Sequence, residues 1–142
     1  GMRFLPDDAM HLDCYVDADF AGLWGYEDKH DPSCVKSHTG FIILAGGCPI
    51  LWSSKLQMEI ALSMTMEAEY YVLSLAMKEL IPMKRLVSEV CGSMQLDAKE
   101  EARIKTTVWE DNAACLTLAN LELLQVTPRS KHFAVKYHWF HT

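Results

Sequence analysis

The sequence predicts a single α/β domain over residues 1–142, and three observations carry this prediction. Residues 11–16 alternate between polar and apolar side chains, which is the period of a half-buried strand. The apolar runs 40–44 and 50–53 flank a segment with a Gly-Gly pair, which is typical of a β-hairpin. From Thr65 onward the apolar side chains recur at helical spacing instead.

The remaining elements follow in order along the chain. Thr65 is a suitable N-cap for a long helix that extends to about Val90, and we expect Pro82 to kink or break it. Residues 104–109 are predicted to form a fourth strand, and residues 113–119 a short helix behind it. Aromatic residues at helical spacing predict a last amphipathic helix over residues 131–140. The order is therefore three strands, a helix, a strand and two helices.

Composition limits the classes of protein that fit. The chain has 142 residues, half of them hydrophobic, which suits one core but hardly two. Neither a run of about 18 apolar residues nor a secretory leader is apparent, so we expect a soluble, intracellular protein with no membrane partner. The five cysteines form no Cys-x-x-Cys pair, which favours reduced thiols, and we interpret His138 and His141 as surface residues rather than zinc ligands. The net charge of −6 disfavours strong binding to nucleic acid by the isolated chain.

Three acidic residues lie where a predicted strand ends or a helix begins, namely Asp17, Glu67 and Asp111. Carboxylates that converge from such positions can hold divalent metal ions. Taken alone, Asp17 would be interpreted as a solvated turn residue, Glu67 as a charge in the first helical turn and Asp111 as an N-cap. The sequence around each of them is YVDADFAG at 15–22, MEAEY at 66–70 and VWEDNAA at 108–114.

These motifs, in this order, resemble the ribonuclease H domain of copia-type long-terminal-repeat retrotransposon polyproteins. The resemblance covers nearly the whole chain. Further matching segments are KSHTGF at 36–41, WSSKLQ at 52–57, ALS at 61–63, LAN at 118–120, RSKH at 129–132 and KYHWF at 136–140.

The resemblance implies a fold and an activity. The fold would be a ribonuclease H-like mixed sheet with flanking helices, in which the first three strands are antiparallel and the fourth is parallel to the first. A fifth strand and a terminal helix with a fourth aspartate would follow Thr142, so the domain is expected to be incomplete at its C-terminus. The activity would be hydrolysis of the RNA strand of RNA·DNA hybrids during reverse transcription, with two Mg²⁺ ions, or Mn²⁺ in their place.

The resemblance also assigns roles to residues. Asp17, Glu67 and Asp111 would be the catalytic metal ligands, and Lys55, Lys131 and His132 are candidates for contacts to the substrate backbone. Asp19 shares a strand face with Asp17 and could assist it, whereas Glu69 and Glu110 are expected to be surface charges. The partners would be the RNA·DNA hybrid and the reverse transcriptase domain of the same polyprotein, in a cytoplasmic retroelement particle or in the nucleus.

Two other hypotheses remain open. The chain could be a catalytically inactive remnant that serves as a structural module beside a reverse transcriptase. The acidic charge, the expected end at Thr142 and one residue more than the family has between Ser63 and Glu67 favour this alternative. An integrase core would share the general fold, but its motifs are absent.

Overall fold

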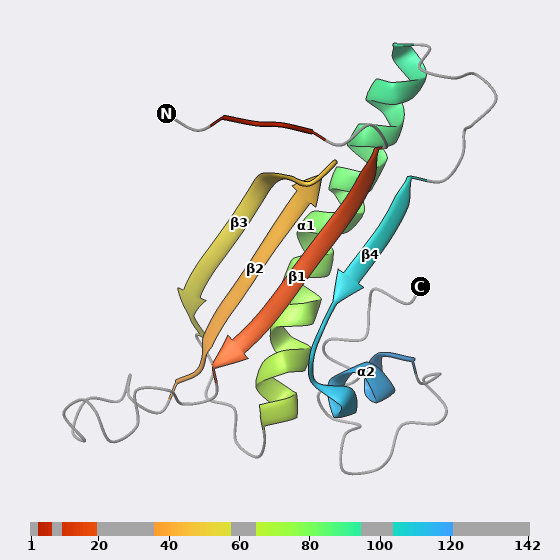
Figure 1. The fold of residues 1–142 in the computed structure, drawn as a ribbon. Coiled ribbons are helices and arrows are strands. Elements are labelled where there is room, and N and C mark those ends of the chain that lie inside the picture. The colour runs from red at the N-terminus through yellow and green to blue at the C-terminus, as the bar shows by residue number, and fades with distance from the viewer. Residues whose placement is uncertain (1–2, 7–9, 20–35, 58–64, 95–103, 121–142) are drawn as a thin grey trace.

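The computed structural model describes residues 3–6, 10–19, 36–57, 65–94 and 104–120. These residues form a four-stranded sheet and two helices (Figure 1). In chain order the elements are β1 (His11–Asp19), β2 (His38–Ala45), β3 (Cys48–Leu56), α1 (Thr65–Ser93), β4 (Lys105–Trp109) and α2 (Ala113–Asn120). The predicted elements within the described residues are thus confirmed, and the helix predicted over 131–140 lies outside them.

The sheet is mixed and has the strand order β3-β2-β1-β4. β1 pairs antiparallel with β2, β2 pairs antiparallel with β3, and β1 pairs parallel with β4. This arrangement is the one expected for the first four strands. Because α1 runs back along the sheet, its first turns lie at the same end as the carboxyl ends of β1 and β4 (Figure 1).

The hairpin between β2 and β3 depends on its two glycines. Gly46 and Gly47 have φ angles of 52° and 75°, which other residues adopt only at a cost in energy. Two positive φ values in a row are typical of the two-residue turns that match the twist of antiparallel strands. The Gly-Gly pair therefore has a structural role.

The core lies between α1 and one face of the sheet. On β1 the side chains of every second residue are buried, and they meet buried side chains from β2, α1 and α2. The buried face of β1, which contains every second residue, thus packs against the apolar face of α1, whose residues recur at helical spacing. The principal members of this core are Leu12, Cys14, Val16, Ile43, Ala68, Val72, Leu73, Ala76, Leu80 and Cys115.

Helix α1 continues through Pro82, so the expected break does not occur. Proline lacks the N–H that would bond to the carbonyl of Lys78, which normally destabilises a helix. Here Pro82 lies on an exposed part of α1, where water can satisfy that carbonyl.

The end of α1 extends beyond the sheet. With 29 residues it is about 44 Å long at roughly 1.5 Å per residue, whereas a nine-residue strand such as β1 spans about 30 Å. Leu86 and Val90, which the helical pattern assigns to the buried stripe, are accordingly 54% and 46% exposed. Helical spacing alone would place them in the core, but this end of α1 projects beyond the described strands, so they are not buried.

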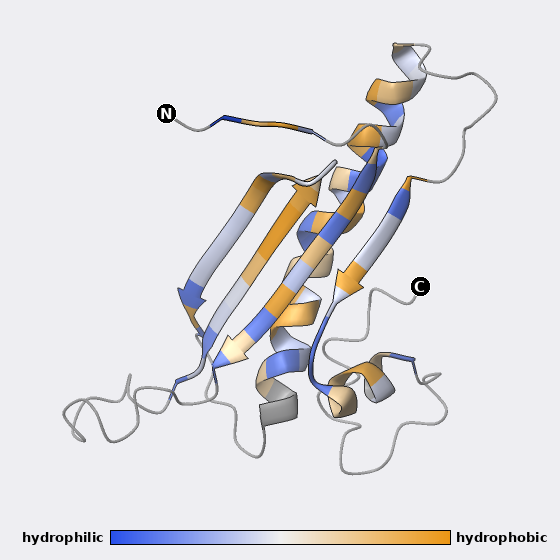
Figure 2. Ribbon diagram, viewed as in Figure 1, coloured by the Kyte–Doolittle hydropathy of each residue, from blue (hydrophilic) through white to orange (hydrophobic). Residues whose placement is uncertain are grey.

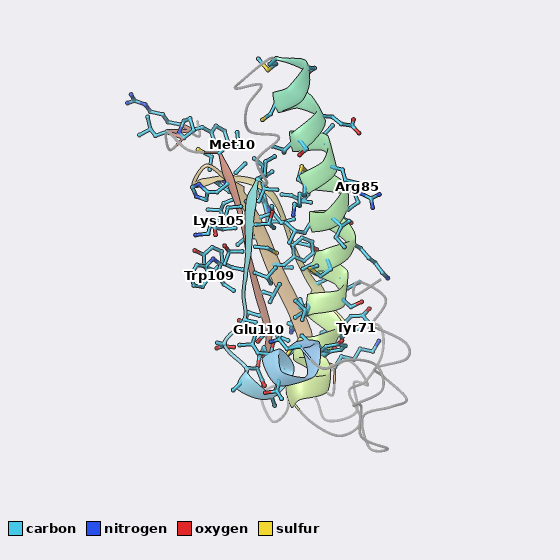
Figure 3. All side chains as sticks on the ribbon, turned by 90° about the vertical axis from the view of Figure 1, so that its right-hand side faces the viewer. Met10, Tyr71, Arg85, Lys105, Trp109 and Glu110 are labelled. Carbon is cyan, nitrogen blue, oxygen red and sulfur yellow. The ribbon has the colours of Figure 1, made fainter. Side chains whose placement is uncertain are left out.

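The sheet face opposite α1 carries a row of apolar side chains that crosses all four strands. In the strand register Trp52 pairs with Ile42, Ile42 with Tyr15, and Tyr15 with Trp109. The Tyr15 and Trp109 rings stack with centroids 5.9 Å apart, and the Trp109 Nε1 donates to Asp13 Oδ1 at 3.1 Å. Figure 3 shows Trp109 and Lys105 on the side of the sheet away from α1, and Figure 2 shows the alternating polarity of β1.

The described cysteines agree with the expectation of reduced thiols. Cys14, Cys48, Cys91 and Cys115 are all free. Burial raises the pKa of the Cys14 thiol to about 12, which keeps it protonated and unreactive at neutral pH. Among the described helices, none is both long and apolar enough to cross a membrane.

Candidate metal centre

Three carboxylates from three separate elements meet at the end of the sheet where β1 and β4 finish. Asp17, Glu69 and Asp111 each offer one oxygen, and these three oxygens lie within 4.8 Å of one another. Asp17 is on β1 beside Gly40 of β2, Glu69 is in the first turns of α1, and Asp111 follows β4 by two residues. We call this group the carboxylate cluster.

The parallel pairing of β1 and β4 explains why two of these residues meet. Tyr15 of β1 is paired with Trp109 of β4, and each of the two aspartates lies two residues beyond its member of that pair. Parallel strands end at the same edge of a sheet, so residues at equal distances beyond a pair remain neighbours. Glu69 approaches from the helix, where the positive end of the helix dipole favours a carboxylate.

Glu69 is the buried member of the cluster. Its side chain is 3% exposed, and its Oε2 atom has no hydrogen-bond partner among the described residues. Burial raises the pKa of Glu69 to about 8, with a further increase from the charges of Glu110, Asp17 and Asp111, although the backbone N–H of Ala18 donates to the carboxylate and opposes the shift. A buried oxygen without a partner, surrounded by negative charge, is an unfavourable arrangement that a bound cation would relieve.

Glu110 lies beside the carboxylate cluster and makes two hydrogen bonds. Its Oε1 accepts a hydrogen bond from the Asn112 backbone N–H at 2.9 Å, and its carboxyl is hydrogen-bonded to the Cys115 thiol. Its Oε2 is buried without a partner among the described residues. Burial is the main reason that the pKa of Glu110 is raised, and the charges of Asp111 and Asp17 add to it. Figure 3 shows Glu110 beyond the end of β4, close to α2.

Helix α2 is fixed at its start by Asn112. The Asn112 Oδ1 accepts hydrogen bonds from the backbone N–H groups of Ala114 and Cys115, both at 3.0 Å. This is an N-cap, and it satisfies two of the amides that a helix leaves unpaired at its first turn. Asn112 therefore takes the N-cap role that Asp111 would have had if taken alone, and Asp111 lies in the carboxylate cluster.

The structure revises the sequence-based assignment in the first turns of α1. The expectation that Glu69 and Glu110 are surface charges is wrong, because Glu69 is buried in the cluster and Glu110 is half-buried beside it. The side chain of Glu67 lies outside the described residues, so its predicted role as a ligand stays untested. Glu69 occupies the place in the cluster that was predicted for Glu67.

A signal for Glu69 was present in the sequence. Val72, Leu73 and Ala76 are buried on α1, and Glu69 precedes them by three, four and seven residues. That is the spacing of one helix face, so Glu69 continues the buried stripe. Residues two positions apart differ by about 200° around a helix, so the buried stripe is specific enough to single out Glu69.

The other candidates from the sequence lie outside the carboxylate cluster or outside the described residues. Asp19, the last residue of β1, is exposed and is not a member of the cluster. Lys55 is exposed on β3 and lines a cavity of about 450 Å³ between β2, β3 and α1, and none of the three cluster residues lines that cavity. Lys131 and His132 lie outside the described residues, as do His138 and His141, so nothing tests them.

The cluster fits a hard divalent cation. All three ligands are carboxylate oxygens, which Mg²⁺, Mn²⁺ and Ca²⁺ prefer over nitrogen or sulfur. With Mg–O distances of about 2.1 Å, neighbouring ligands of an octahedral Mg²⁺ ion are about 3.0 Å apart and opposite ligands about 4.2 Å apart. The three oxygens lie within 4.8 Å of one another, so they would have to move closer together to share one ion.

Comparison with known proteins relates the chain to a retrotransposon polyprotein. No protein-family model matches the chain, and no solved structure matches it. Over 125 residues the chain is 36% identical to the retrovirus-related Pol polyprotein from transposon TNT 1-94 of Nicotiana tabacum. The matched region covers 88% of this chain but 8% of that polyprotein. The chain is therefore a relative of one segment of a retrotransposon Pol polyprotein.

Proposed function

We propose that this chain is a ribonuclease H domain of a copia-type retrotransposon polyprotein, which hydrolyses the RNA strand of RNA·DNA hybrids with Mg²⁺ or Mn²⁺. The observation that carries the proposal is the convergence of Asp17, Glu69 and Asp111, of which Glu69 is buried with an oxygen that has no partner among the described residues. The α/β fold with its mixed sheet is compatible with a ribonuclease H-like fold, and the relationship to a Pol polyprotein supplies a setting for this activity.

The residues of the cluster would act by holding charge in fixed positions. Asp17 and Asp111 would bind metal at the open end of the sheet, and Glu69 would bind it from the helix side. Bound divalent ions can activate water for attack on a phosphodiester and stabilise the leaving oxygen. Glu110, which is half-buried and hydrogen-bonded to the Asn112 backbone N–H and the Cys115 thiol, would keep the loop between β4 and α2 in place.

The substrate would be recognised mainly by its shape and backbone. Hybrid helices differ from DNA in their 2′-hydroxyl groups, which a protein can contact across the shallow groove. Lys55, Lys131 and His132 remain proposed contacts to the backbone. The reverse transcriptase domain of the same polyprotein would supply the rest of the binding surface, because this chain carries a net charge of −6.

The test is cleavage of an end-labelled RNA·DNA hybrid with Mg²⁺ or Mn²⁺, by the parent chain and by two matched variants. Asp17→Asn should abolish metal-dependent cleavage without unfolding the protein. Asp19→Asn removes the same charge from the same strand two residues further on, outside the cluster, and should retain cleavage. Cleavage by Asp17→Asn at the parent rate would refute the assignment of the cluster.

A longer version of the chain, continued through a family-like fifth strand and terminal helix, is the second arm of this test. Cleavage by the longer version alone would mean that the three carboxylates need a further ligand. Absence of cleavage by both versions, with folding intact, would favour the inactive structural module instead.

A further inference from the structure

Gln57 links the edge of the sheet to the helix that carries Glu69. It directly follows β3 and is 4% exposed, which is unusual for a polar side chain. Its backbone N–H donates to the Ser37 carbonyl at 2.8 Å, and its side-chain Nε2 donates to the Ala68 carbonyl at 3.3 Å. The first bond fixes Gln57 next to the start of β2, and the second ties it to α1.

Ala68 immediately precedes Glu69 in the first turns of α1. A helix carbonyl at this position also accepts from the amide four residues later, and a carbonyl oxygen has two lone pairs for the two bonds. Glu69 itself receives a hydrogen bond from the backbone N–H of Ala18 on β1. The turn that carries Glu69 is thus attached to β1 on one side and, through Gln57, to the end of β3 on the other.

We propose that Gln57 is a positioning residue for the carboxylate cluster: it holds the first turns of α1 against the sheet so that Glu69 reaches Asp17 and Asp111. This inference rests on the proposed role of Glu69 as a metal ligand. Ligand oxygens of one Mg²⁺ ion are about 3.0 to 4.2 Å apart, and the cluster oxygens lie within 4.8 Å of one another, so a shift of the helix start away from the sheet would oppose shared coordination. Misplacements of about 1 Å strongly reduce catalysis.

Thr39→Val is a matched control for Gln57→Met. Thr39 is 5% exposed, and its Oγ1 donates to the Lys55 carbonyl at 3.0 Å, so it too makes a buried bond from a side chain to a carbonyl. Both substitutions keep the approximate volume and remove one donor. The bond of Thr39 joins β2 to β3, however, whereas that of Gln57 reaches α1.

The experiment measures Mg²⁺ affinity from the metal dependence of thermal melting, and amide hydrogen exchange along α1. We expect both variants to lose a similar amount of unfolding free energy, because each substitution removes one hydrogen bond to a buried carbonyl. Only Gln57→Met should weaken Mg²⁺ binding, by about tenfold or more. It alone should also accelerate amide hydrogen exchange at Tyr70, Val72 and Leu73 relative to the second half of α1. If the variants cleave hybrid, Gln57→Met should lower kcat while KM stays near the parent value.

Equal Mg²⁺ affinity and equal exchange in the two variants would overturn the inference. If Gln57→Met does not fold, Gln57→Asn replaces it, because a side chain one methylene shorter cannot reach Ala68 while the adjoining cavity of about 450 Å³ can hydrate its amide. If the parent chain binds no Mg²⁺, the metal-site proposal fails on its own, and the exchange rates alone decide whether Gln57 fixes the turn that carries Glu69.

Discussion

Replacing Glu69 with glutamine should make the metal-free protein more stable above neutral pH while removing its response to metal. The carboxylate of Glu69 is buried among negative charges, so its pKa is raised from 4.5 to about 8 in the folded state. Glutamine has nearly the same shape, and its amide oxygen can still accept the hydrogen bond from the Ala18 N–H. The substitution therefore removes the charge with little change in packing.

The sign and size of the effect follow from proton linkage. A carboxyl whose pKa is higher in the folded state binds its proton more tightly there, so its contribution to stability is greatest below pH 4.5 and is lost as the pH rises to about 8. With these two pKa values, the parent should lose roughly 3 to 4 kcal/mol between pH 5 and pH 8 through this group. Glu69→Gln should not show this loss.

Urea denaturation at pH 5 and pH 8, each with and without Mg²⁺, measures these quantities. At pH 8 the parent should be stabilised by about 2.7 kcal/mol when Mg²⁺ is present at one hundred times its dissociation constant, and the variant should gain nothing. An unchanged difference in stability between the two pH values in Glu69→Gln would refute the linkage argument. A preserved Mg²⁺ response would refute the role of Glu69 as a ligand.

Three further substitutions test the structure around the site and the core. Asn112→Ala removes the acceptor for the backbone N–H groups of Ala114 and Cys115 and should cost about 1 kcal/mol of unfolding free energy in urea, so no loss would contradict the N-cap assignment. Leu80→Ala should cost about 2 to 5 kcal/mol, because Leu80 is 2% exposed in the core, whereas Leu86→Ala on the overhanging end of α1 should cost less than about 1 kcal/mol. Similar losses in the two leucine variants would show that the end of α1 is covered in solution.

Local periodicity was sufficient to predict the elements of the fold. The alternation in β1, the Gly-Gly turn and the helical stripe after Thr65 are each encoded within a few neighbouring residues, so a single sequence can reveal them. The strand order and the parallel pairing of β4 with β1 depend on contacts between distant residues. Those features were expected from the resemblance to a family and not from the pattern itself.

The choice between Glu67 and Glu69 required the phase of α1 relative to the sheet. Both residues lie in the first turns of the helix, and only their rotation about its axis distinguishes them. The apolar stripe fixes that rotation if it is taken from Val72 and Leu73, which are buried, but less well from Leu86, which is exposed. Sequence alone does not show where the sheet ends beneath a helix. The apolar pattern of α1 therefore predicts a longer buried face than the structure has.

The burial of Glu69 supports the proposed metal centre over the proposed inactive structural module. A module that only has to fold gains nothing from burying Glu69 with an unpartnered oxygen beside Glu110, whose Oε2 is likewise unpartnered among the described residues. Both groups have raised pKa values, so ionising them lowers the stability of the fold. An apolar side chain at either position would avoid this loss, as replacement of buried charges often does. A bound divalent cation would instead stabilise the folded state, because the carboxylates would coordinate it together and the unfolded chain would not bind it. The same burial that makes the metal-free protein less stable at high pH is what would give the cluster its affinity for metal.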